Sequence, residues 1–348
     1  MNGQPAARQA TMAGPPGPIV CFGEILIRLA SRRGEMLLHN SLLEVCIGGA
    51  EANVAVMLAR LGQPSGMVSV VSDNELGSVA RGELRRHGVD VDRVATAKGR
   101  MGLYFLQPGS GVRAPKVIYD RKDSAFAAAN LETIDWHAIL AGAARLHLSG
   151  ITLALNPGCA RATIAAARVA AELGVPVSFD GNYRATLWDE RKSQAGALAA
   201  QIIENADVAF VDHRDLGLML GRDWRSWKEM DAATAAAFAA WPKLQRIAST
   251  TRIPCNGAEM SASASLFTRK GRHDTEPRKV FGVAERVGSG DAFAAGLLLG
   301  LQRDLSDPDA LDFAFASFLL KHSIVGDMNI VSHGEIEAVL AGEGHIRR

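Results

Sequence analysis

The sequence predicts an α/β protein in which a mostly parallel sheet carries helices on both faces and a smaller sheet is inserted beside it. Three observations lead to this fold class. Short apolar runs alternate with stretches whose apolar residues recur at helical spacing, several of those stretches end at a glycine, and two β-rich segments interrupt the alternation. Alternating strands and helices are typical of parallel sheets, because the crossover helices must cover the sheet.

The first apolar run, 19–22, is expected to be a buried strand. A helix is expected over 49–61, because Val54, Met57 and Leu58 fall on one face and Gly62 ends the pattern. The same reasoning predicts strands at 68–71, 146–148, 175–179 and 208–211, and helices at 75–87, 160–173 and near 194–204.

Two segments, 36–46 and 101–121, look like strands without helices between them. Their β-rich stretches at 102–105 and 117–119 are separated by glycines and prolines. We interpret them as a small antiparallel sheet, with lid segments at about 33–47 and 99–123 inserted into a domain spanning 19–348. A small sheet cannot bury both faces alone, so it should close over a cleft or pair with another subunit.

The composition excludes several classes of function. The 348 residues carry a formal net charge of +1, so no basic excess points to nucleic acid, and no apolar stretch is long enough for a membrane span. The Ala-, Gly- and Pro-rich residues 1–18 are expected to be a disordered leader. The four cysteines are scattered and suggest no disulfide framework or zinc site, so a cytoplasmic location is expected.

The turn Val287-Gly288-Ser289-Gly290-Asp291 leads into an apolar helix. The free N–H groups and the dipole of a helix N-terminus favour an anion, so this turn predicts a phosphate cradle. Asp291 is expected to cap the helix, to have a depressed pKa and to act as a general base. The alternative is a capped helix start with no further role.

Other nucleotide-binding signatures are missing. No GxGxxG follows the first strand and the chain has no Gly-Lys dipeptide, which disfavours a dinucleotide fold and a Walker P-loop. Ligands of open α/β sheets bind at the carboxyl ends of the strands. Polar residues follow two predicted strands there: Asp180, Asn182 and Arg184 after the strand at 175–179, and Ser249, Thr250, Thr251 and Arg252 after residues 246–248.

Two separated motifs, Gly48-Gly49-Ala50-Glu51-Ala52-Asn53-Val54-Ala55 and the segment 287–296, lie about 240 residues apart. In sequence, order and spacing they resemble the two signatures of the ribokinase-like (PfkB) carbohydrate kinase family. The resemblance extends over residue 19 to about residue 340. It implies a three-layer α/β/α sandwich with an inserted β-sheet lid, and a homodimer in which lids pair.

Further stretches at 23–29, 117–121, 148–154 and 326–329 look like those of 2-keto-3-deoxygluconate kinases. This resemblance implies transfer of the γ-phosphoryl group of ATP, with Mg²⁺, to the terminal (C6) hydroxyl of 2-dehydro-3-deoxy-D-gluconate. The anionic substrate should need a guanidinium for its carboxylate, for which Arg121 and Arg184 are the candidates.

The resemblance assigns the remaining roles residue by residue. The catalytic group is Asp291 with Gly288, Ser289 and Gly290. The implied sugar-acid site consists of Gly49, Ala50, Glu51, Asn53, Tyr104, Tyr119, Arg121, Arg184 and Asp327. The implied nucleotide contacts are Asn182, Arg184, Thr250, Arg252, Gly288, Ser289 and Gly290.

Two departures from the family pattern leave parts of the site open. Asp212-His213-Arg214-Asp215 stands where Asn-x-x-Glu is usual, so no metal ligands are assigned, and residues 249–252 replace the start of the usual Gly-rich loop. A fructokinase or ribokinase remains the main alternative function. A non-catalytic sugar-acid sensor is a second alternative, and the missing fingerprint disfavours a nicotinamide oxidoreductase.

Overall fold

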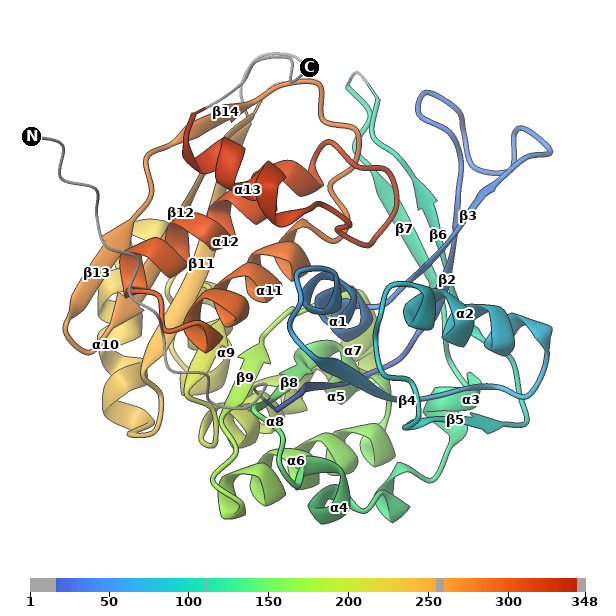
Figure 1. Ribbon diagram of the computed structural model, residues 1–348, viewed down its shortest axis with the longest axis horizontal. Coiled ribbons are helices and arrows are strands. Elements are labelled where there is room, and N and C mark those ends of the chain that lie inside the picture. The colour runs from blue at the N-terminus through green and yellow to red at the C-terminus, as the bar shows by residue number, and fades with distance from the viewer. Residues whose placement is uncertain (1–16, 111, 255–259, 343–348) are drawn as a thin grey trace, which may run out of the picture.

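The computed structural model describes residues 17–110, 112–254 and 260–342, which form two sheets and the helices around them (Figure 1). The main sheet has ten strands in the order β13-β12-β11-β10-β9-β8-β1-β4-β5, with β14 paired to β12. Strands β11, β10, β9, β8, β1, β4 and β5 are parallel to one another, and β12, β13 and β14 add an antiparallel edge. The mostly parallel sheet predicted from the sequence is confirmed.

The strands of the main sheet are β1 (Ile19–Phe22), β4 (Ser65–Ser72), β5 (Val94–Ala97), β8 (Arg145–Ser149), β9 (Val177–Asp180), β10 (Val208–Phe210), β11 (Arg246–Pro254), β12 (Met260–Thr268), β13 (Gly271–Asp274) and β14 (Arg278–Val280). The helices are α1 (Ala50–Arg60), α2 (Glu75–Arg86), α3 (Ala125–Ala128), α4 (Trp136–Leu140), α5 (Gly150–Leu155), α6 (Pro157–Glu172), α7 (Ala185–Trp188), α8 (Ala195–Ile203), α9 (His213–Leu220), α10 (Met230–Ala240), α11 (Ser289–Gln302), α12 (Asp307–Lys321) and α13 (His333–Leu340). The predicted elements recur within a few residues of these bounds.

Two hydrophobic cores flank the main sheet. Side chains alternate along β1, so Ile19 and Cys21 enter one core and Val20 and Phe22 enter the other. The first core includes residues of α1, α2, α11, α12 and α13, and the second includes residues of α4, α6, α8, α9 and α10. The result is a three-layer α/β/α sandwich.

The smaller sheet has the strand order β3-β2-β6-β7 and projects from one end of the sandwich (Figure 1). Its strands are β2 (Leu26–Ala30), β3 (Glu44–Gly48), β6 (Gly102–Gln107) and β7 (Lys116–Asp120). The sequence-based expectation of a purely antiparallel sheet is wrong, because β2 and β6 are parallel. Strand β2 was not predicted as part of this sheet, and residues 36–43 form turns instead of a strand.

The expected polar loop at 249–252 is also wrong. These residues continue β11, which pairs antiparallel with β12 as a long hairpin. Of the residues that follow, 260–264 lie in β12, whereas 255–259 fall outside the described residues. Of the predicted leader, residues 1–16 fall outside the described part. The carbonyl oxygen of Gly17 accepts a hydrogen bond from Gln63, and that of Pro18 accepts one from Ala144.

Among the helices in the described ranges, none combines the length and the apolarity that crossing a bilayer requires.

Candidate active site

The strand order fixes where a ligand should bind. From β1 the chain continues to β4 on one side, and β8 returns to pair with β1 on the other, so the sheet has a topological switch point between β1 and β8. Glu51 of α1 lies at this point, where its Oε1 accepts hydrogen bonds from Ser149 Oγ (2.5 Å) and Thr152 Oγ1 (3.2 Å). Burial raises the pKa of Glu51, and the hydrogen bond from Ser149 opposes that shift.

The two sequence motifs meet at this edge of the sheet. Asn53 Nδ2 donates a hydrogen bond of 2.6 Å to Asp291 Oδ2, which joins residues 238 positions apart. Helices α1 and α11 lie side by side, and both contribute to the first core (Figure 1). The Asn53 amide therefore fixes the orientation of the candidate base.

Asp291 differs from the sequence-based expectation in two ways. Helix α11 begins at Ser289 with Gly288 as its N-cap, and no side chain caps it, so Asp291 lies in the first turn but is not the cap. The pKa of Asp291 is raised to about 7, not depressed. Burial is the main cause, and the hydrogen bond from Asn53 opposes it. A carboxylate with a pKa near 7 is well matched to proton acceptance at neutral pH.

The turn before α11 packs against the loop that carries Asp327. Gly288 has a φ of +78°, and a Cβ at this position would come within 1.8 Å of the Asp327 carbonyl oxygen. Only glycine allows both the left-handed backbone and this close approach. The free N–H groups at the start of α11 are therefore held at a fixed position relative to the Asp327 loop.

Guanidinium groups converge beside this helix N-terminus. Arg252 of β11 donates from Nη2 to Ser289 Oγ (3.0 Å) and lies 4.9 Å from the centre of the Phe318 ring. Desolvation of the guanidinium and, to a lesser extent, the neighbouring charges of Arg286 and Arg184 together lower the pKa of Arg252 to about 10. Like charges gathered at the positive end of a helix dipole form a site suited to a polyanion such as a triphosphate.

Two further carboxylates lie on the same edge. The pKa of Asp180, at the end of β9, is raised by burial and by the charge of Asp291. Burial and the Asp212 charge raise the pKa of Asp215 to about 7, while Asp215 Oδ2 accepts the Asp212 N–H (3.1 Å) in a capping box at the start of α9. Within the described ranges, no group of three or more acidic, histidine or cysteine side chains is arranged to hold a metal ion.

The other wall of the site comes from the small sheet. Tyr104 donates from its hydroxyl to Asp327 Oδ2 (2.5 Å), and its ring lies 6.2 Å from that of Tyr119. Burial raises the pKa of Asp327, and the charge of Arg28 opposes that shift. A Cβ on Gly48 would come within 2.2 Å of Asp327 Oδ2, so the glycine of the N-terminal motif makes room for this carboxylate.

The two candidate arginines are in different environments. Arg121 is buried, and its Nε and Nη2 lie 2.7 and 2.6 Å from Glu24 Oε2, while Ser124 donates to the other Glu24 oxygen. Arg184 is exposed at the start of α7, and within the described ranges no carboxylate lies within ion-pair distance of it. Arg184 is therefore available to bind the anion of a ligand, whereas the Arg121 guanidinium is already paired with the Glu24 carboxylate.

Asn182 and Thr250 lie on the same edge of the sheet, after β9 and within β11. In the described part of the chain, no hydrogen bond links either side chain to the turn at 288–291.

Arg28 and Glu24 were not identified from the sequence as site residues. The sequence signal that could have identified Arg28 is an arginine inside the otherwise apolar strand β2. In the structure Arg28 is 1% exposed, and its guanidinium lies within 3.1 Å of the carboxylates of both Glu285 and Asp327.

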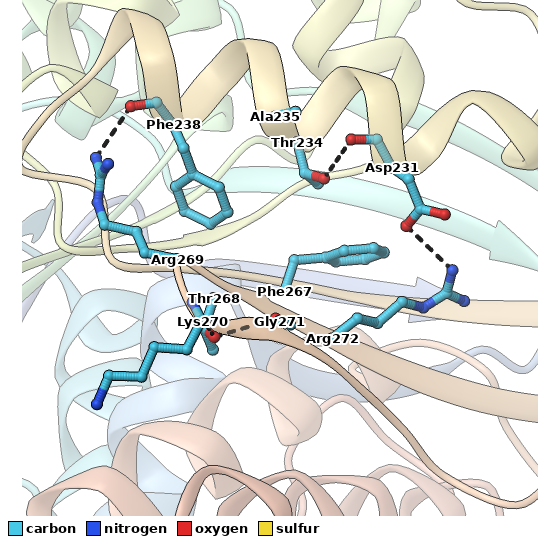
Figure 2. Close-up of a pocket in the computed structure, with 10 residues that line it drawn as sticks. All are labelled: Asp231, Thr234, Ala235, Phe238, Phe267, Thr268, Arg269, Lys270, Gly271 and Arg272. Atoms are coloured by element: carbon cyan, nitrogen blue, oxygen red, sulfur yellow. Dashed lines mark hydrogen bonds and ion pairs between the residues drawn. The ribbon is translucent and has the colours of Figure 1, made fainter.

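A separate hollow of about 510 Å³ lies between α10 and the β12–β13 hairpin (Figure 2). It contains none of the residues described above. Arg269 at its rim donates to the carbonyl oxygens of Phe238, Trp241, Pro242 and Leu244, so this guanidinium is already used within the fold. The candidate site is therefore at the switch point and not in this hollow.

Similar proteins share both the fold and the length of this chain. A 2-dehydro-3-deoxygalactonokinase of Haloferax volcanii is 32% identical over 324 residues, covering 93% of this chain and 96% of the relative. A 2-dehydro-3-deoxygluconokinase of Bacillus subtilis is 30% identical, covering 89% and 91%. The crystal structure of a 2-dehydro-3-deoxygluconokinase from Thermotoga maritima has a TM-score of 0.88 at 34% identity, covering 94% of this chain and 99% of the other.

The family model described as "pfkB family carbohydrate kinase" matches residues 18–329, which include both motifs and the small sheet. The chain therefore belongs to the PfkB family of carbohydrate kinases.

Proposed function

We propose that this kinase transfers the γ-phosphoryl group of ATP to the terminal (C6) hydroxyl of 2-dehydro-3-deoxy-D-gluconate and releases the 6-phosphate. The observation that carries the proposal is the Asn53–Asp291 pair, which holds a base in the first turn of α11 beside three guanidiniums. The names of the relatives from Haloferax volcanii and Bacillus subtilis support a 2-dehydro-3-deoxy sugar acid as substrate.

In this proposal Asp291 accepts the proton of the sugar hydroxyl. The new bond forms between that oxygen and the γ-phosphorus as the bond from the γ-phosphorus to the β,γ-bridging oxygen breaks, and ADP leaves. The N–H groups at the start of α11 and the guanidinium of Arg252 stabilise the charge that develops on the transferred group. Asn53 acts by holding the Asp291 carboxylate in one orientation.

Mg²⁺ fits this site as an ion carried mainly by the nucleotide. The nearby carboxylates of Asp180 and Asp215 are oxygen ligands of the type that Mg²⁺ prefers, and one or two such groups usually suffice when phosphates and waters supply the rest. When bound, Mg²⁺ neutralises charge on the phosphate oxygens.

The substrate carboxylate is assigned chiefly to Arg184, because Arg121 already neutralises Glu24. Arg121 remains a predicted contact through the part of its guanidinium that Glu24 does not use. Tyr104, Tyr119 and Asp327 are assigned to the sugar hydroxyls, because Asp327 and Tyr104 place a paired donor and acceptor on the wall that the small sheet contributes.

A coupled assay for ADP release tests this function across sugars and sugar acids. We expect 2-dehydro-3-deoxygluconate or its galactonate epimer to have a kcat/KM at least about 100-fold above that of fructose or ribose, since an unpaired guanidinium penalises neutral sugars. Higher turnover of fructose or ribose would favour the sugar kinase alternative. Binding of the acid without any ADP release would favour the sensor.

We also propose a dimer that forms through the small sheets. The outer strands expose Val45 and Ile118, which share one face of the sheet because their pairing partners Leu29 and Phe105 are themselves paired, and Leu42 before β3 is 60% exposed. The opposite face packs Leu26, Tyr104 and Leu106 into a small core, whereas Val45 and Ile118 belong to none of the hydrophobic cores of the described residues. A second copy of the chain would bury them. Light scattering should give a mass of about two chains for the wild type and about one for Val45→Glu.

A further inference from the structure

Lys321, the last residue of α12, is completely buried (0% exposed). Its Nζ donates one hydrogen bond, to the Ile324 carbonyl oxygen at 2.9 Å. Lysine is almost never fully buried unless its charge is compensated, because taking an ammonium out of water is costly. Neither the sugar-binding role nor the base chemistry proposed above uses this residue.

The side chain of Lys321 lies directly behind the candidate phosphate cradle. A Cβ on Gly288 would come within 3.2 Å of Lys321 Cε and within 1.8 Å of the Asp327 carbonyl oxygen. The cradle turn, the Lys321 stem and the Asp327 loop therefore pack against one another. In the same region, the Ala284 N–H donates to the His322 carbonyl oxygen at 2.8 Å, which ties the end of α12 to the segment leading into the cradle.

Four charged groups lie close enough to the Lys321 ammonium to influence its pKa. Glu285 precedes the cradle, Asp327 lies in the adjoining loop and Asp291 lies in α11, and all three favour the charged form of Lys321. Arg28 of β2 disfavours it. Burial is the largest influence and lowers the pKa of Lys321 to about 8. Other titratable groups of this region are Cys46 of β3, Tyr104 of β6, Arg252 of β11, Arg286 beside the cradle and His322.

We propose that Lys321 is a positioning residue for phosphoryl transfer: its stem supports the Gly288 turn against the Asp327 loop, and its ammonium places a fixed positive charge behind the cradle. The inference rests on the proposed role of residues 288–291 as the phosphate cradle. The charge acts through the turn, without contact with substrate, and it favours the transition state because negative charge develops on the far side of the turn.

The test compares Lys321→Met and Lys321→Arg with Lys270→Met, which removes an exposed lysine on the β12–β13 turn. We expect Lys321→Met to lower kcat about 10- to 100-fold with both KM values changed less than about threefold, the signature of an interaction made mainly in the transition state. Lys270→Met should match the wild type. A folded Lys321→Met variant with kcat within twofold of the wild type would overturn the proposal.

The pH profile of kcat separates an electrostatic role from simple support of the fold. In the wild type, kcat should fall as pH rises through about 8, where Lys321 loses its proton. In Lys321→Arg this limb should move above about pH 10, because arginine stays charged. An unchanged alkaline limb would refute the electrostatic role even if Lys321→Met fails to fold. The comparison uses whichever sugar the wild type phosphorylates, so an incorrect substrate assignment is detected separately in the substrate screen.

Discussion

Replacing Asp291 with asparagine should make the enzyme more stable while almost abolishing its activity. Asparagine keeps the shape of the side chain and an oxygen that can accept the Asn53 hydrogen bond, but it removes the charge. The pKa of Asp291 is raised from 3.8 to about 7, which means that the native state favours the protonated carboxyl. At 1.36 kcal/mol per pKa unit, ionising Asp291 costs the native state about 4 kcal/mol at pH 8.

The direction of this stability change with pH follows from the linkage between protonation of Asp291 and folding. The protonated carboxyl of Asp291 contributes its full stability below the unfolded pKa, and this contribution is lost as pH rises through the folded value of about 7. The neutral variant does not undergo this loss. Its gain over the wild type should approach about 4 kcal/mol at pH 8 and fall to roughly 2 kcal/mol or less at pH 5.

Thermal unfolding at pH 5 and pH 8 measures this difference, with Asp73→Asn as a control at an exposed aspartate. At roughly 2 °C per kcal/mol, Asp291→Asn should unfold about 8 °C higher than the wild type at pH 8. Its kcat should fall about 10²- to 10⁴-fold, as expected for loss of a general base. Equal unfolding temperatures at pH 8, or a gain of the same size at pH 5, would show that the carboxylate is not destabilised in the native state.

Three more predictions use the same contacts. Asn53→Ala removes a hydrogen bond that lowers the pKa of Asp291, so the acidic limb of kcat/KM, measured with both substrates below KM, should move up by about one unit; an unmoved limb would contradict the pairing. Arg184→Gln should raise the KM for the sugar acid about 10- to 100-fold with a smaller effect on kcat, and equal KM values in steady-state assays would remove Arg184 from the acid site. Arg28→Met should lower the free energy of unfolding in urea by about 3–5 kcal/mol because it leaves the buried Asp327 carboxylate and the largely buried Glu285 carboxylate without their cation, whereas Arg161→Met at an exposed pair should cost under about 1 kcal/mol.

Much of the fold and the centre of the site could be predicted from the sequence. Alternating strands and helices place the carboxyl ends of the parallel strands at one edge, and the N- and C-terminal motifs meet there through Asn53 and Asp291. Local pattern was sufficient in these cases because both motifs lie at the starts of helices that pack together.

Properties that depend on distant neighbours could not be predicted. A helix N-terminus should lower the pKa of Asp291, but burial and the nearby carboxylates reverse the shift. The carboxylate that neutralises Arg121 comes from Glu24, 97 residues earlier, and no local pattern indicates that pair. The burial of Arg28 and Lys321 is also set by elements that are remote in sequence.

The parallel pairing of β2 with β6 also determines when the lid can form during folding. Strands β2 and β6 are separated in the chain by β3, α1, β4, α2 and β5, and all of these except β3 belong to the body of the sandwich. Parallel neighbours require such a crossover, so the pair must close a long loop that contains strands β4 and β5 of the main sheet. Contacts of this separation form late. The lid should therefore form only together with these body elements, and it cannot be excised as an independent cassette.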